Sequence, residues 1–117
     1  MGGTGETLEE LERVIVSRRG EPENRSYTAR LLAAGPRKVG GKVVEEAGEV
    51  AMAAVAEADD RVVAECADLV YHTLVLLASR GLTLEAVGGE LRRRFGTSGL
   101  DEKAGRATPT PPAEDAP

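Results

Sequence analysis

Apolar residues recur every three or four positions along most of this chain, which is the spacing of a buried helix face. Glycine, proline and short polar residues interrupt the pattern and mark the ends of the segments. The segments predict helices over about residues 8–19, 27–33, 36–57, 60–80 and 84–95. No stretch shows the strict alternation of a strand, so the pattern predicts an all-α bundle of about five helices.

Short polar residues stand where these helices are expected to begin. The candidate N-caps are Thr7, Ser26 or Thr28, Asp59 or Asp60, and Thr83. Pro36 suits the first turn of the third helix. That helix also contains Gly40, Gly41 and Gly48, each of which costs about 1 kcal/mol relative to alanine. The glycines indicate a local flaw, a place of close approach or a hinge.

The two ends of the chain differ from the helical middle. Residues 1–6 are rich in glycine and are expected to be flexible. Residues 7–95 form the predicted helical domain. From residue 96 to 117 the helical pattern fails, and prolines stand among Thr, Ala, Glu and Asp, which is the composition of a disordered tail.

Composition narrows the class of protein. At 117 residues the chain is one domain, and only 3% of its residues are aromatic, so its aliphatic core is thin and would gain from burial in a dimer. The net charge of −5 argues against a general nucleic-acid binder. The single cysteine, Cys66, lies within a predicted helix and is expected to be a small buried apolar residue. No signal peptide or bilayer-spanning run is evident, so we expect a cytoplasmic protein with no membrane partner.

Two acidic pairs with the same step interrupt the apolar stripes of the third and fourth predicted helices. They are Glu46-x-x-Glu49 and Glu65-x-x-Asp68, and residues three apart share a helix face. The apolar positions on the stripe of Glu46 are Val39, Val43, Val50 and Ala54. Burying an unpaired carboxylate costs on the order of several kcal/mol, so carboxylates that meet here need a cation between them.

A divalent metal between two facing helices satisfies that need. Magnesium prefers oxygen ligands and keeps open positions that phosphate oxygens can fill. We therefore interpret Glu46, Glu49, Glu65 and Asp68 as metal ligands and catalytic residues. The alternative is that these pairs are ordinary solvated helix faces, because glutamate is common there; two such pairs on consecutive helices favour the metal.

Basic and polar residues surround the acidic pairs. Lys38 and Lys42 lie one helical turn apart, and either hold phosphate oxygens or form surface ion pairs. The same two interpretations apply to Arg30. Ser26, Tyr27 and Thr28 form either a polar lip that binds substrate or only a helix cap. His72 either orients a carboxylate, contacts substrate or is a satisfied core residue.

Taken together, these motifs resemble a known family. The acidic signature is similar to that of the all-helical MazG-type nucleotide pyrophosphohydrolases. Three further segments narrow the resemblance to phosphoribosyl-ATP pyrophosphohydrolase. They are Ser26-Tyr27-Thr28-Ala29-Arg30-Leu31-Leu32, Lys38-x-x-x-Lys42-Val43-x-Glu45-Glu46-Ala47, and Ala67-Asp68-Leu69-Val70-Tyr71-His72. The resemblance covers Leu8 to Phe95, and the three helix glycines depart from it.

The resemblance implies a dimer of packed helices with magnesium and phosphates near the acidic helices. It implies hydrolysis of phosphoribosyl-ATP to phosphoribosyl-AMP and pyrophosphate in histidine biosynthesis, with a cyclohydrolase acting next in the pathway as a separate partner. Two other functions stay open: a house-cleaning pyrophosphohydrolase that acts on non-canonical nucleoside triphosphates, and a non-catalytic helical dimer that binds a protein partner.

Overall fold

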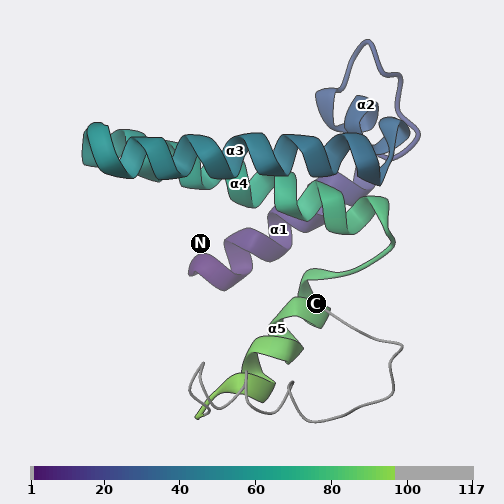
Figure 1. Cartoon of the computed structure of the whole chain (residues 1–117). Coiled ribbons are helices and arrows are strands. Elements are labelled where there is room, and N and C mark those ends of the chain that lie inside the picture. The colour runs from purple at the N-terminus through teal and green to yellow at the C-terminus, as the bar shows by residue number, and fades with distance from the viewer. Residues whose placement is uncertain (1, 97–117) are drawn as a thin grey trace, which may run out of the picture. The chain divides into compact units, whose positions relative to one another are not determined.

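The computed structural model describes residues 2–96, and within them every regular element is a helix. The helices are α1 (Thr4–Ser17), α2 (Tyr27–Ala34), α3 (Pro36–Ala56), α4 (Asp59–Ser79) and α5 (Leu84–Arg94) (Figure 1). The all-α class and the number of helices are therefore as predicted. The predicted disordered tail lies outside the described residues, apart from Gly96.

Two helix starts differ from the prediction. α1 begins at Thr4, with Gly3 rather than Thr7 as its N-cap, and the Thr7 amide donates to the Gly3 carbonyl inside the first turn. Residues 4–6 are thus helical, although we expected them to be flexible, and Glu6 complements the positive helix end. At α4 the N-cap is Ala58, and Asp59 and Asp60 lie in the first turn, where their charges have the same effect.

The starts of α2 and α3 follow the sequence signals. The Ser26 hydroxyl accepts a hydrogen bond from the Ala29 amide at 3.0 Å, so Ser26, not Thr28, is the cap. Gly35 lies between the two helices at φ +93°, a left-handed conformation that favours glycine, and Pro36 then opens α3. The chain therefore turns sharply from α2 into α3.

Helices α1 to α4 belong to one compact unit whose core is aliphatic. α3 and α4 run side by side as a long antiparallel hairpin, and α1 and α2 pack against it (Figure 1). The least exposed side chains are Ile15, Val39 and Val75, which come from α1, α3 and α4. The buried core cluster consists of Ile15, Leu31, Leu32, Val39, Leu74, Val75 and Ala78.

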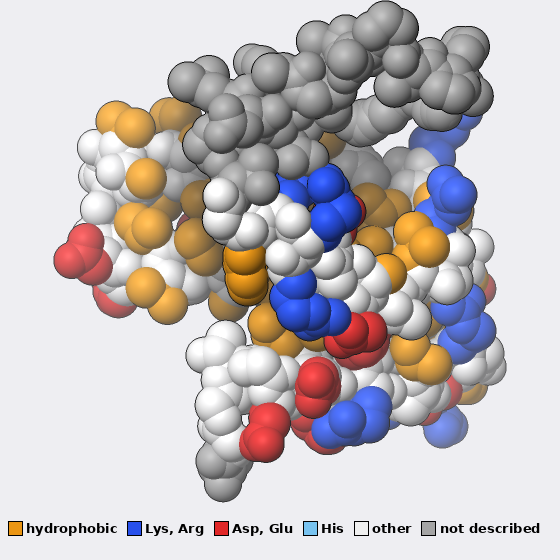
Figure 2. All heavy atoms as spheres, turned by 90° about the horizontal axis from the view of Figure 1, so that it is seen from below, with side chains coloured by type: hydrophobic (Ala, Val, Ile, Leu, Met, Phe, Trp, Pro, Cys, Tyr) orange, Lys and Arg blue, Asp and Glu red, His pale blue; other side chains and the backbone are white. Residues whose placement is uncertain are grey.

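Much of the hairpin surface is apolar and exposed. Figure 2 shows apolar side chains spread over the left part of the molecule, which is the end of the hairpin that carries the α3–α4 turn. The large exposed apolar residues of the hairpin are Val44, Met52, Val55, Val63 and Val70. Cys66 and Ala54, which we expected to be buried, are exposed, because within the unit formed by α1 to α4 neither α1 nor α2 covers these positions of the hairpin.

By length and composition α4 could cross a membrane, with a mean hydropathy of 1.5. The same helix supplies Leu74, Val75 and Ala78 to the core and carries the acidic residues Glu65 and Asp68. Core packing therefore accounts for the apolar character of its second half. Its first half, around Val63 and Cys66, has exposed apolar residues that are left to explain.

Residues 85–96, the described part of the chain after the hairpin unit, belong to a second unit. In it, Glu90 accepts hydrogen bonds from Arg93 and Arg94 on the last turn of α5. These two guanidinium groups lower the pKa of Glu90 to about 2. The basic last turn of this helix thus forms exposed ion pairs with Glu90.

Candidate metal and phosphate site

Three of the four predicted metal ligands come together between α3 and α4. Glu46, Glu65 and Asp68, hereafter the acidic trio, each offer one carboxylate oxygen, and these oxygens lie within 4.8 Å of one another. The side chains of Glu46 and Glu65 are only 15% and 12% exposed. The donor set fits a hard divalent cation, because such ions take carboxylate oxygens and leave positions for phosphate.

Helix periodicity explains why these acids face inward. Glu46 lies seven residues from both Val39 and Ala53, two turns along the helix in either direction, and both of these residues are fully buried. Asp68 lies seven residues before Val75, which is also fully buried. The acids therefore lie on the same sides of α3 and α4 as these buried aliphatic residues.

Glu49 stands apart from the acidic trio. Its side chain is exposed, and it is not among the residues whose carboxylate oxygens meet. It lies one turn beyond Glu46 on α3, toward the α3–α4 turn. Its role as a metal ligand stays a prediction.

Two basic side chains partly neutralise the acidic trio. Arg61 Nη2 lies 2.6 Å from Glu65 Oε2, and Lys42 Nζ lies 3.8 Å from Glu46 Oε2. Lys42 also donates to Glu45 at 3.3 Å, and this hydrogen bond is the main cause of the raised pKa of its ammonium group. Because α3 and α4 are antiparallel, Lys42 and Arg61 approach the trio from opposite ends.

Sequence reasoning missed Arg61. The signal was present, because Arg61 lies four residues before Glu65 and such pairs face each other on a helix. Exposed pairs of this kind are common and weak, so nothing in the sequence set this one apart. The Arg61–Glu65 pair differs from ordinary surface pairs because the side chain of Glu65 is largely buried.

The start of α2 contacts α4 one turn beyond Asp68. Thr28 Oγ1 is hydrogen-bonded to Tyr71 Oη, and Tyr27 Oη lies 3.3 Å from His72 Nε2. The rings of Tyr27 and Tyr71 stack with centroids 6.4 Å apart. These contacts place the predicted polar lip, Tyr27 and Thr28, beside the acidic trio.

His72 is a buried link between the lip and the trio. It is 6% exposed, and its Nδ1 lies 2.8 Å from the carbonyl oxygen of Asp68. A carbonyl can only accept, so Nδ1 carries a proton and donates to Asp68, and Nε2 is hydrogen-bonded to the Tyr27 hydroxyl. Both ring nitrogens are thereby engaged within the protein.

The two remaining predicted phosphate ligands are exposed. Lys38 and Arg30 lie on the surfaces of α3 and α2, and the described part of the chain offers neither side chain an ion-pair partner. Lys38 is one turn before Lys42, so the two ammonium groups lie along the same side of α3. The structure therefore leaves both Lys38 and Arg30 available to an anionic ligand.

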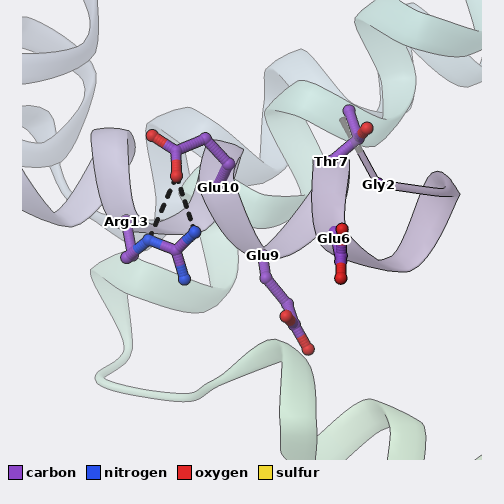
Figure 3. Close-up of a pocket in the computed structure, with 6 residues that line it drawn as sticks. All are labelled: Gly2, Glu6, Thr7, Glu9, Glu10 and Arg13. Atoms are coloured by element: carbon purple, nitrogen blue, oxygen red, sulfur yellow. Dashed lines mark hydrogen bonds and ion pairs between the residues drawn. The ribbon is translucent and has the colours of Figure 1, made fainter.

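A surface hollow elsewhere contains none of these residues. It lies at the start of α1 and is lined by Gly2, Glu6, Thr7, Glu9, Glu10 and Arg13 (Figure 3). Its one basic side chain, Arg13, is bonded to Glu10, which leaves a mostly acidic lining. That lining is unsuited to a phosphate, in contrast to the trio with its flanking cations.

Comparison with known proteins decides the family. The family model described as phosphoribosyl-ATP pyrophosphohydrolase matches residues 8–95, which include every residue of the site described above. The chain belongs to this family. Members of it are hydrolases, and the resemblance seen in the sequence is confirmed.

Individual relatives agree with this result. The chain is 50% identical over 106 residues to a phosphoribosyl-ATP pyrophosphatase of Trichlorobacter lovleyi, covering 91% of this chain and 98% of the relative. It is 52% identical over 105 residues to the protein of that name from Sphingopyxis alaskensis, with 88% and 95% covered. It is also 47% identical to the histidine biosynthesis bifunctional protein HisIE of Helicobacter hepaticus, of which the match covers 45%, and 89% of this chain.

Proposed function

We propose that this protein hydrolyses phosphoribosyl-ATP to phosphoribosyl-AMP and pyrophosphate, a step of histidine biosynthesis, with magnesium at the acidic trio. The observation that carries the proposal is the meeting of three carboxylates, two of them largely covered, between cations that can hold phosphate. Membership of the family supplies the substrate and the reaction.

In this reaction water adds across the anhydride bond between the α and β phosphates. The hydroxyl joins the α phosphorus, the bond from that phosphorus to the bridging oxygen breaks, and pyrophosphate leaves with the electron pair of that bond, while the remaining proton of the water passes to a carboxylate base. Bound magnesium supplies neutralisation of phosphate charge and activation of water. Glu46, Glu65 and Asp68 hold that ion, Glu49 assists from the rim, and one of these four carboxylates positions or deprotonates the water.

The surrounding residues bind and orient the substrate. Lys38 and Lys42 hold phosphate oxygens on the α3 side, and Arg30 does so from α2. Tyr27 and Thr28 contact the nucleoside end. His72, with both nitrogens bonded, serves the site by fixing Tyr27 against the turn of α4 that carries Asp68.

Pyrophosphate release tests the reaction. Purified protein with magnesium should release pyrophosphate from phosphoribosyl-ATP and leave orthophosphate absent. A panel with ordinary and damaged nucleoside triphosphates should show much slower release. Faster turnover of damaged triphosphates would instead identify a house-cleaning enzyme, and no release from any substrate would contradict the proposal.

We also propose that two copies associate through the exposed side of the hairpin. Gly41, Val44, Gly48 and Val55 share one face of α3, and Val44 and Val55 are 72% and 85% exposed. This outer face is separate from the one that carries Glu46. Exposed apolar residues that gather in one region mark an interaction surface. Contact of so many apolar side chains of the hairpin with water is unfavourable, and burial against a second copy would remove it.

Sedimentation tests the association. The wild-type protein should be a dimer at micromolar concentration, and Val55→Lys should shift it toward monomer because a charge buried at the interface is costly. Val16→Lys on α1, where the valine is 50% exposed, is the matched control and should leave the dimer intact. A monomeric wild-type protein would refute the dimer without touching the catalytic proposal.

The proposed reaction implies two further assignments. The enzyme should act in the cytoplasm, where a small nucleotide substrate is made. A cyclohydrolase should be the pathway partner of this chain, and the name of the Helicobacter relative, a histidine biosynthesis bifunctional protein, supports a second activity of the same pathway beside this one.

A further inference from the structure

The residues of the site follow a fixed order along α4. Arg61, Glu65, Asp68 and His72 are spaced by three or four positions and therefore lie along one side of the helix. Arg61 is nearest the α3–α4 turn, the acidic residues are in the middle, and His72 is at the end that contacts α2. The distance from residue 61 to residue 72 is about 16 Å along the helix axis.

Arg61 can bind a ligand at the end of this row of residues that lies nearest the α3–α4 turn. Its Nη2 donates to Glu65, its Nε lies 3.5 Å from Glu57, and its side chain is 55% exposed. A guanidinium has five N–H donors in a planar fork, so donors remain for another partner. That fork matches phosphate oxygens better than an ammonium does.

We propose that Arg61 binds the pyrophosphate end of the substrate, and that the substrate lies along the hairpin with its nucleoside end at the polar lip. This inference rests on the proposed function and adds an orientation and a ligand to it. The order of groups carries it: the aromatic and hydroxyl side chains of the lip lie at one end of the acidic trio, on the side from which Lys42 approaches, and the guanidinium of Arg61 lies at the other end.

The ion pair with Glu65 holds the Arg61 side chain in position while no substrate is bound. Without metal, Arg61 offsets the charge of a largely covered carboxylate. A cation at that carboxylate would weaken the attraction of Arg61 to Glu65 and would leave the guanidinium available to the phosphates of the substrate. Glu57 keeps the side chain near the turn meanwhile.

Titration calorimetry of the full chain with two probes tests the inference. Inorganic pyrophosphate with magnesium measures binding at the end of the site near Arg61, and AMP measures binding at the opposite end, near Tyr27 and Thr28. Arg61→Gln should weaken pyrophosphate binding about tenfold or more, the loss expected for a hydrogen bond to a charged group. AMP binding should change less than about twofold, and Arg61→Lys should recover part of the loss.

Arg13→Gln is the matched control, because Arg13 is also an exposed arginine that pairs with a glutamate on its own helix. It should alter neither probe. Unchanged pyrophosphate binding in Arg61→Gln would overturn the inference, as would equal losses for both probes.

Titration with magnesium in the absence of phosphate distinguishes direct phosphate binding by Arg61 from an indirect effect of Arg61 on the metal site. Arg61→Gln should bind magnesium at least as tightly as the wild type, since a competing cation is gone. Loss of magnesium binding would show that Arg61 acts only by supporting the metal, and would overturn the inference while leaving the proposed function in place. A wild-type protein that binds neither magnesium nor pyrophosphate would refute both.

Discussion

Replacing Asp68 with asparagine removes one negative charge from the acidic trio and keeps the shape of the side chain. The three carboxylate oxygens lie within 4.8 Å of one another. Two unit charges at that distance repel by about 3.5 kcal/mol at an effective dielectric constant of 20, and by about 0.9 kcal/mol in water. Asp68 is exposed, and Lys42 and Arg61 offset part of the repulsion, so the lower figure applies.

Two opposite effects on thermal stability follow from this estimate. Without metal, Asp68→Asn should gain about 1 kcal/mol, which raises Tm by roughly 4–8 °C for a domain of this size. With magnesium at ten times its Kd, the wild type should gain about 1.4 kcal/mol, and the variant should gain little because it has lost a ligand. The variant should thus be the more stable protein only when metal is absent.

Circular dichroism melts with and without magnesium measure both effects. Protein concentration must be held fixed, since association shifts apparent stability. Glu10→Gln is the control, because Glu10 is 64% exposed on α1 and lies outside the trio, and it should respond to magnesium like the wild type. An equal magnesium-dependent rise in Asp68→Asn would refute the metal site, and a less stable metal-free variant would refute the repulsion argument.

Other substitutions test other parts of the structure. Glu49→Gln should lower pyrophosphohydrolase activity but keep most of the magnesium-dependent rise in Tm, because Glu49 lies outside the acidic trio; loss of that rise would make it a direct ligand. His72→Phe should cost about 1–3 kcal/mol in denaturant unfolding, from two lost hydrogen bonds, and an unchanged midpoint would contradict the link. Gly40→Ala should stabilise the folded protein by about 0.5–1 kcal/mol, because an added Cβ meets no atom within 4 Å. Gly48→Ala, on the outer face, should stabilise it less if a second copy of the chain fills the space around Gly48. Equal stabilisation by the two substitutions would argue against close packing of a second copy at Gly48. Because the pKa of Glu90 is lowered, its stabilisation of α5 should be fully present above pH 4.5 and be lost as pH falls toward 2. An NMR titration of Glu90 with a midpoint near 4.5 would show that the ion pairs with Arg93 and Arg94 do not form in solution.

The helices were predictable because their limits are local. Gly35-Pro36 and Gly81 end helices through backbone conformations that other residues rarely adopt, and the Ser26 cap is a hydrogen bond within four residues. The start of α1 was missed because glycines in residues 2–5 hide a helix that the acidic first turn supports. Periodicity also brought Glu46, Glu65 and Asp68 to one place, since inward faces of two adjacent helices must meet.

Burial on the hairpin was not predictable in the same way. The sequence shows that Ala54 and Cys66 lie on apolar faces, but the pattern does not say what covers a face. Within the described unit of α1 to α4, both residues are exposed. If the second copy proposed above packs there, the expected burial is a property of the dimer and is absent from the single chain.

The arrangement of faces on α3 allows association and catalysis to proceed together. A helix turns 100° per residue, so the outer face with Gly41, Val44 and Val55 is far around the helix from Glu46. Val39 and Ala53, on the side of Glu46, are already buried against this chain's own helices. A partner that covers the outer face therefore leaves the acidic trio open to substrate. The proposed dimer surface and the proposed metal site therefore lie on opposite sides of the same hairpin.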